Sequence, residues 1–181
     1  MIRILIIGCG DIAMRVASLL QGKPGHYQLF GLTRNSARDA SLRQAGITPV
    51  SGDLDHRISL NRLAGLAQIV LHFAPPPIGA TSDTRTRNLL SALSRRTLPK
   101  YFIYISTSGV YGDCGGAQVN ETRPLNPQTS RAQLRVDAEQ QIRNWAKLNG
   151  VHASILRVPG IYAQDRLPLD RLRVEIGRAH V

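Results

Sequence analysis

The chain begins with an apolar run that leads directly into a glycine turn and then into an amphipathic helix. The run covers residues 2–7, and the turn reads Gly8-Cys-Gly-Asp-Ile-Ala13. The first glycine permits a tight turn, the second leaves room for a pyrophosphate, and the small alanine lets the helix pack against the strand. The free N–H groups of the helix then face the phosphates, which predicts a dinucleotide-binding unit. The cofactor residues assigned to this unit are Gly8, Gly10, Asp11, Ile12 and Ala13.

Apolar runs and helical patterns alternate along the rest of the chain. The expected strands cover about residues 2–7, 27–33, 47–50, 68–73, 100–105 and 151–156. The expected helices cover about residues 14–20, 36–45, 58–63, 84–96 and 130–149. Strands separated by helices predict an α/β fold: a Rossmann-type doubly wound parallel sheet of about six strands, with helices on both faces. Ligands of such sheets bind beyond the carboxyl ends of the strands.

Composition limits the remaining classes of protein. The 181 residues suffice for one domain, and 43% hydrophobic and 19% charged residues are typical of a globular protein. The first apolar run is too short for a transmembrane helix and lacks a signal-peptide pattern, so we expect a cytoplasmic protein without a membrane partner. Two cysteines provide no disulfide framework, and no Cys/His spacing predicts a metal site.

The net charge of +11 raises the question of a nucleic-acid partner. The arginines are scattered through every segment, with no basic tail and no interleaved aromatic residues of the kind that single-strand binders use. We therefore expect no nucleic-acid partner. An anionic cofactor accounts for part of the charge.

The segment after the second expected strand carries arginines and lacks an acid. It reads Thr33-Arg-Asn-Ser-Ala-Arg38. An acid usually holds the free 2′-hydroxyl of an adenosine ribose there, whereas a guanidinium suits a 2′-phosphate. We therefore expect NADP to be favoured over NAD, although solvent-facing arginines at a helix start are the alternative. The cofactor residues assigned here are Arg34, Asn35 and Arg38.

Asp53 and Leu54 follow the third expected strand. The carboxylate of Asp53 could accept a hydrogen bond from an adenine amino group, so both residues are assigned to the cofactor. Alternatively, Asp53 caps the next helix.

Five further segments follow the glycine turn in a fixed order along the chain. They read Gly52-Asp-Leu54, Val70-Leu-His-Phe-Ala74, Asn88-Leu-Leu90, Ile105-Ser-Thr-Ser-Gly-Val-Tyr-Gly112 and Leu156-Arg-Val-Pro-Gly-Ile-Tyr162. With the glycine turn, this series resembles the extended short-chain dehydrogenase/reductases, which include the NAD-dependent epimerase/dehydratase group acting on nucleotide sugars. The resemblance implies that Thr107 occupies the position of the catalytic Ser/Thr. It also implies that Ala74, Pro75 and Pro159 line the cofactor near the nicotinamide.

The chain departs from this family at the Tyr-x-x-x-Lys pair. The resemblance places Arg131 on the tyrosine and Arg135 on the lysine, which in the family binds the nicotinamide ribose. Arg135 can keep that contact, but a guanidinium stays protonated and cannot serve as an acid/base. We expect Arg131 to bind an anion, or alternatively to form a salt bridge with Asp113 or Glu121.

The acid/base is therefore open among four side chains, namely Tyr111, Asp113, Cys114 and Tyr162. Tyr111 is favoured on chemistry, although the resemblance implies a structural role for it. His72 lies within an expected strand and is predicted to be a core residue hydrogen-bonded to backbone.

Family members carry a smaller substrate domain beyond the last expected strand, and we expect it to be missing here. Residues 175–181 read like translated sequencing-adapter DNA, so residues 1–174 are expected to form the NAD(P)-binding domain and 175–181 a non-native tail. The expected function is an oxidoreductase or epimerase/dehydratase acting on a hydroxyl or carbonyl group. The alternative is a non-catalytic NADP-binding sensor or assembly protein. A small-molecule substrate is the expected partner, and a homodimer is compatible with the fold.

Overall fold

The computed structural model describes residues 1–21 and 26–167, and within them the strands form one sheet of the order β3-β2-β1-β4-β5-β6. These strands are β1 (Ile2–Ile7), β2 (Tyr27–Thr33), β3 (Ile47–Ser51), β4 (Ile69–His72), β5 (Tyr101–Thr107) and β6 (His152–Val158). Every neighbouring pair is parallel. The predicted doubly wound sheet is confirmed. The strand order reverses between β1 and β4, which is where such sheets bind ligands.

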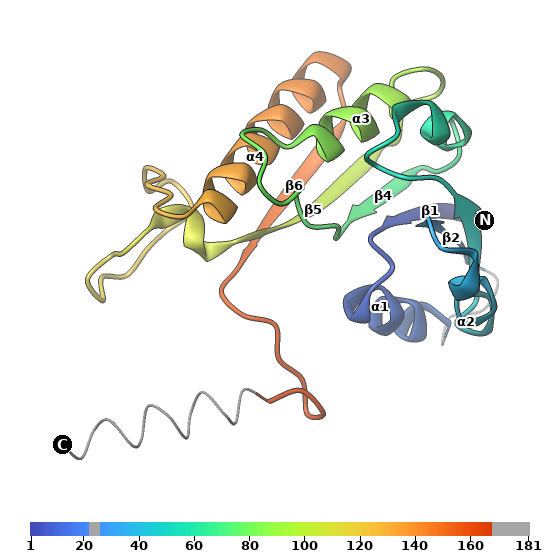
Figure 1. Cartoon of the computed structure of the whole chain (residues 1–181), viewed down its shortest axis with the longest axis horizontal. Helices are drawn as coiled ribbons and strands as arrows, with labels where there is room; N and C mark the ends of the chain where they lie inside the picture. Colours follow the sequence, from blue (N-terminus) through green and yellow to red (C-terminus); the bar gives the residue numbers. More distant parts are fainter. Residues whose placement is uncertain (22–25, 168–181) are drawn as a thin grey trace.

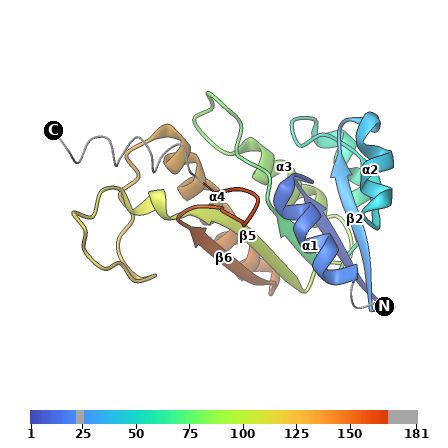
Figure 2. The same ribbon diagram turned by 90° about the horizontal axis from the view of Figure 1, so that it is seen from below.

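Helices cover both faces of the sheet. They are α1 (Asp11–Gln21), α2 (Asp39–Gln44), α3 (Thr84–Leu93) and α4 (Ser130–Asn149), with the 3-10 helices η1 (Ser36–Arg38), η2 (Arg57–Leu63) and η3 (Ser108–Tyr111). Figures 1 and 2 show α3 and α4 on one face and α1 and α2 on the other. The core is accordingly split in two, and β1 contributes to both halves: Ile4 and Ile6 face α1, while Leu5 and Ile7 face the other side. A strand buried on both faces explains the four consecutive apolar residues 4–7.

Two of the predicted helices differ from the expectation. The helix expected over 36–45 is interrupted, because the Asn35 side chain accepts a hydrogen bond from the Ala37 N–H and starts a separate 3-10 turn before α2. The helix expected over 58–63 is entirely 3-10. Leu60 and Leu63 are both buried there, and a 3-10 helix aligns side chains that lie three residues apart.

Helix α4 has the predicted bounds. The Thr129 hydroxyl accepts a hydrogen bond from the Ala132 N–H at its start, and Gly150 ends it in the left-handed conformation with φ +66°. Leu134, Ala138, Ile142 and Trp145 form an apolar stripe along α4, and all four are buried. The stripe fixes the rotation of the helix and hence the direction of the arginines in its first two turns. Residues 168–181, including the expected tail, lie outside the described residues.

Candidate functional site

The glycine turn between β1 and α1 packs tightly on one side and is open on the other. Gly8 has φ +91°, and a Cβ atom on it would lie 2.5 Å from the backbone nitrogen of Ala74. A Cβ atom on Gly10 would meet nothing within 4 Å. Ala13 is fully buried beneath the turn. The turn therefore needs Gly8 for the fold itself, whereas Gly10 faces free space.

A pocket of about 380 Å³ lies where β1, β2, β3 and β4 end, directly beside this turn. Its lining includes eight predicted cofactor residues: Gly8, Gly10, Arg34, Arg38, Asp53, Leu54, Ala74 and Pro75. Other predicted residues have local roles. Asp11 pairs with Arg15 and Arg166 at 3.1 and 3.0 Å, and Asn35 caps η1. Strands distant in sequence thus converge on one concave surface, as the sequence predicts.

The two predicted arginines of this pocket differ in their contacts. Arg38 donates from Nη2 to the carbonyl oxygen of Cys9 at 2.7 Å, which ties η1 to the glycine turn. Arg34 lines the pocket and makes no hydrogen bond or ion pair with another described residue. Its guanidinium is therefore available to an anion.

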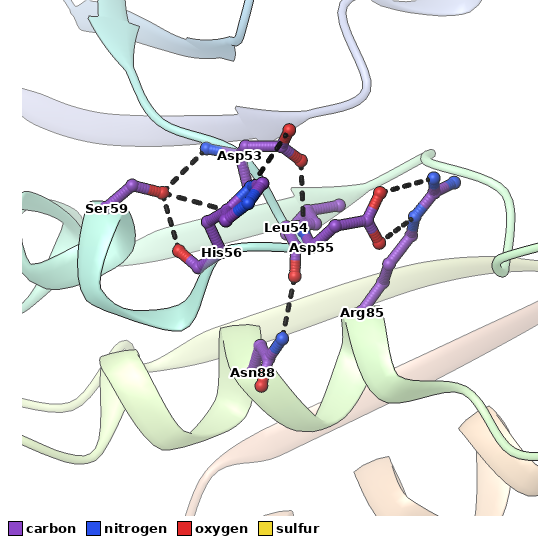
Figure 3. A network of polar contacts seen from close by, with 7 residues as sticks. All are labelled: Asp53, Leu54, Asp55, His56, Ser59, Arg85 and Asn88. Carbon is purple, nitrogen blue, oxygen red and sulfur yellow. Dashed lines mark hydrogen bonds and ion pairs between the residues drawn. The ribbon is translucent and has the colours of Figure 1, made fainter.

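A polar network surrounds the segment that carries Asp53 and Leu54, two residues of the pocket lining (Figure 3). Arg85 of α3 donates to both carboxylate oxygens of Asp55, at 2.8 and 2.7 Å, and this contact holds the pKa of Asp55 below its usual range. Asn88 donates to the Leu54 carbonyl at 2.8 Å. The segment that carries Asp53 is thus held to α3 by two side chains. Neither contact could be foreseen, because no local pattern links residues some 30 positions apart.

Asp53 does not cap the next helix. Its Oδ1 atom accepts a hydrogen bond from the Asp55 N–H at 3.0 Å, and η2 begins after His56, which makes no side-chain cap. The capping alternative is therefore wrong, because the Asp53 carboxylate accepts from the N–H two residues later, in a turn that precedes the helix. Its other oxygen lies 3.5 Å from the His56 ring nitrogen, on an exposed imidazole.

A second pocket, of about 490 Å³, lies where β5 and β6 end. The lining brings together Thr107, Arg131, Arg135 and Pro159, all of them predicted site residues, and also includes Gly160 and Arg166. The Thr107 hydroxyl accepts a hydrogen bond from the Gly109 N–H at 3.2 Å, which starts η3. Thr107 and the two arginines of α4 therefore line the same pocket.

Arg135 is a buried cation. Its side chain is anchored by Nη1, which donates to the Tyr104 hydroxyl at 2.9 Å and to the Ile105 carbonyl at 2.7 Å. Its Nε atom is buried without a partner, and no described carboxylate pairs with it. Arg131, one turn earlier, is exposed, and the structure shows no salt bridge from it to Asp113 or Glu121 among the described residues.

Tyr111 lies in a different pocket, of about 620 Å³, with Cys114 and Arg143. Its hydroxyl accepts a hydrogen bond from Nη1 of Arg157 at 2.7 Å. Arg157 in turn pairs at 2.7 Å with the buried Glu139, whose pairing raises the pKa of the guanidinium above its usual range. Tyr111 and Thr107 therefore line two different pockets, which share Pro159.

Two of the remaining acid/base candidates are Asp113, whose side chain bonds within its own turn, and Tyr162, whose side chain faces solvent. Asp113 accepts from the Gly115 N–H at 2.8 Å, and Tyr162 is 72% exposed.

His72 is buried, as predicted, but its partner is a side chain and not the backbone. The Thr86 hydroxyl donates to Asp83 at 2.7 Å and so accepts from His72 Nε2 at 3.0 Å. The other ring nitrogen, Nδ1, is buried without a partner among the described residues. Burial, assisted by the charge of Arg135, lowers the pKa of His72 to about 3.

We expect stability to fall in mild acid because of His72. Its pKa in the folded state lies below the unfolded value of 6.5, so the unfolded chain takes up a proton first and stability decreases as pH falls from 6.5 towards 3. The loss between pH 7 and pH 5 is about 2 kcal/mol. Urea unfolding at both pH values measures it, and His72→Gln, which retains a donor to Thr86, should lose less by about this amount. Equal losses in the two proteins would refute the assignment.

Within the described residues, no helix is long and apolar enough to cross a membrane. The profile of the NAD dependent epimerase/dehydratase family matches residues 4–173. The chain is 28% identical over 142 residues to dTDP-glucose 4,6-dehydratase of Mycolicibacterium smegmatis. This alignment covers 70% of this chain and 42% of that protein. The chain spans less than half the length of the curated relatives that it matches.

Solved structures agree with this match. A putative NAD-dependent epimerase/dehydratase from Methylobacillus flagellatus is 25% identical, with a TM-score of 0.72 over 94% of this chain and 59% of that one. UDP-glucuronic acid 4-epimerase from Bacillus cereus in complex with NAD is 21% identical and shares the fold, with a TM-score of 0.72 over 89% of this chain and 57% of that one. The glycine turn, the sheet order and the family profile lead to one conclusion: the chain belongs to the NAD dependent epimerase/dehydratase family.

Proposed function

We propose that the protein is an NAD(P)-dependent oxidoreductase of the epimerase/dehydratase type that acts on a hydroxyl or carbonyl group of a nucleotide sugar. The observation that carries the proposal is the pocket beside the glycine turn, at the switch point of the sheet. Its residues fit a dinucleotide: space is free at Gly10, and Arg34 lines the pocket without a hydrogen bond or salt bridge to another described residue, although its charge acts on Asp55. The relatives named above are a dehydratase and an epimerase of nucleotide sugars, which supports the substrate class.

The chain's own residues would bind and orient the reactants. The first N–H groups of α1 would hold the pyrophosphate, and Asp53 would accept a hydrogen bond from the adenine amino group. Thr107 would donate to the reacting oxygen of the substrate, and Arg135 would take the place of the family's lysine at the nicotinamide ribose. The nicotinamide, when bound, accepts or supplies the hydride. Arg131 cannot replace the family's tyrosine as acid/base, because a guanidinium stays protonated. The proton of the reacting hydroxyl group must therefore be transferred by a side chain other than Arg131.

The replaced tyrosine also supports a second candidate, an NADP-binding sensor or assembly protein without catalysis. The two are distinguished by incubating the protein with NAD or NADP and a panel of dTDP- and UDP-sugars. Turnover of a sugar, detected by reduced-nicotinamide absorbance and by chromatography of the products, supports the enzyme. Tight cofactor binding without any turnover supports the sensor.

Cofactor choice is expected to depend on Arg34. We expect Arg34→Asp to weaken NADP binding by about 1.5 to 3 kcal/mol, the range for hydrogen bonds to charged groups, and to affect NAD much less. Titration calorimetry with both cofactors measures the difference. Arg43→Asp, on the adjacent helix α2 and outside the pocket, is the matched control for net charge. An equal loss for both cofactors would show that Arg34 does not contact the 2′-phosphate.

A further inference from the structure

We infer that the pocket at the ends of β5 and β6 selects substrates that carry a carboxylate or phosphate group, which Arg131 and Arg135 bind. The inference rests on the proposed function for the identity of the cofactor. It extends that function by requiring a negative charge on the part of the substrate that lies next to Thr107.

The lining of this pocket is strongly one-sided in charge. It contains three arginines, Arg131, Arg135 and Arg166, and no aspartate or glutamate. Arg166 is already paired with Asp11 at 3.0 Å. The other two have no carboxylate partner among residues 1–21 and 26–167. Two positive charges therefore remain to be neutralised.

Arg135 provides the second and independent observation. Only 6% of the residue is exposed, and its two hydrogen bonds go to the uncharged oxygens of Tyr104 and Ile105. Its Nε atom is buried without a partner. A buried cation is costly unless an anion pairs with it. Elsewhere in the fold, the positive charge of Arg157 is compensated by the buried Glu139, which lies 2.7 Å away. Arg135 lacks such a partner, as expected where a ligand supplies the negative charge.

The two arginines line the pocket from successive turns of one helix. Arg131 and Arg135 lie one turn apart on α4, so their side chains are neighbours on the helix surface and repel one another when no anion is present. An oxyanion between them would remove the repulsion and accept hydrogen bonds from both forks. Thr107 lines the same pocket, which places the anion close to the reacting oxygen.

The cofactor's phosphates do not account for these charges. The pocket beside the glycine turn shares no lining residue with this one. It has cations of its own in Arg34, Arg38 and Arg85. The nicotinamide ribose proposed as a partner of Arg135 is uncharged and leaves its positive charge without a counter-ion, so the anion bound by Arg131 and Arg135 is assigned to the substrate.

The test compares three sugars that differ at one carbon: glucose, glucuronate and glucose 6-phosphate. Binding to the protein saturated with NADP is measured by calorimetry. We expect one or both anionic sugars to bind and glucose not to bind, and the stronger of the two identifies the group. Arg131→Gln should weaken that binding about tenfold or more, and Arg131→Lys should retain part of it. Arg143→Gln, on the same helix but outside this pocket, should bind like the wild type.

Arg131 is the primary variant because it is exposed and its replacement leaves the core intact. NADP affinity is measured on the same samples. Unchanged cofactor affinity with lost sugar binding supports the inference. Equal affinities for glucose and the anionic sugars, or an equal loss in Arg143→Gln, would overturn it. A parallel loss of NADP affinity in Arg131→Gln would also overturn it, since the arginine would then serve the cofactor. If the wild type binds the anionic sugars but no cofactor, the proposed function fails while the anion site stands.

Discussion

Replacing Gly10 with valine is expected to abolish dinucleotide binding while the protein remains folded. A Cβ atom at this position meets nothing within 4 Å, so the side chain fits the protein alone. It then occupies the space through which the pyrophosphate approaches the first N–H groups of α1. We expect a loss of at least about 2.7 kcal/mol, or a hundredfold in Kd. Calorimetry with NAD and NADP measures it, and the far-UV circular dichroism should be unchanged.

Gly8→Ala is the informative comparison. Gly8 has φ +91°, and the added Cβ atom would lie 2.5 Å from the Ala74 nitrogen, so this variant should lose stability as well as cofactor binding. The two variants thus distinguish a loss of stability, expected at Gly8, from a loss of cofactor binding alone, expected at Gly10. A folded Gly10→Val protein with wild-type affinity would remove the glycine turn from the cofactor site.

The second large effect is expected from Glu139→Ala. Glu139 is 2% exposed, pairs with Arg157 at 2.7 Å and accepts a hydrogen bond from the Ser106 hydroxyl at 2.6 Å. Its removal leaves a largely buried guanidinium without a counter-charge and a buried hydroxyl without its acceptor. Breaking one side of a buried ion pair costs about 3 to 5 kcal/mol. Denaturant unfolding measures the loss.

The control for this prediction is Glu121→Ala, which removes an exposed carboxylate in the loop that precedes α4. It should change stability by no more than about 0.5 kcal/mol. If Glu139→Ala were as mild, the ion pair that joins α4 to β6 would contribute little to the fold. Because Arg157 also holds the Tyr111 hydroxyl, the variant should in addition alter the tyrosine's near-UV spectrum.

The sequence predicted the strands of the sheet and the longest helix, because their apolar patterns are long and regular. The strands β1 and β2 and the helix α4 have the expected bounds because their apolar patterns agree with their end signals. The helices around 36–45 and 58–63 were less predictable. Short segments have few periodic positions, and a single capping contact such as that of Asn35 decides their form.

The candidate site was predictable where residues follow directly after strands. Thr107, Arg131 and Arg135 meet because the ends of β5 and β6 and the start of α4 share one edge of the sheet. The contacts of Arg85 with Asp55 and of Arg157 with Glu139 were not predictable. Each joins side chains distant in sequence, and arginines are too frequent in this chain for composition to single one out.

The buried cysteine of the glycine turn has a chemical consequence. Cys9 is 6% exposed, and burial raises the pKa of its thiol to about 11, against the opposing charge of Arg38. Only the thiolate is readily oxidised or alkylated, and at neutral pH almost none is present. A sulfur atom thus lies in the turn beside the proposed cofactor while remaining inert. Peroxide and electrophilic reagents should spare this turn as long as the strand and helix around it stay packed.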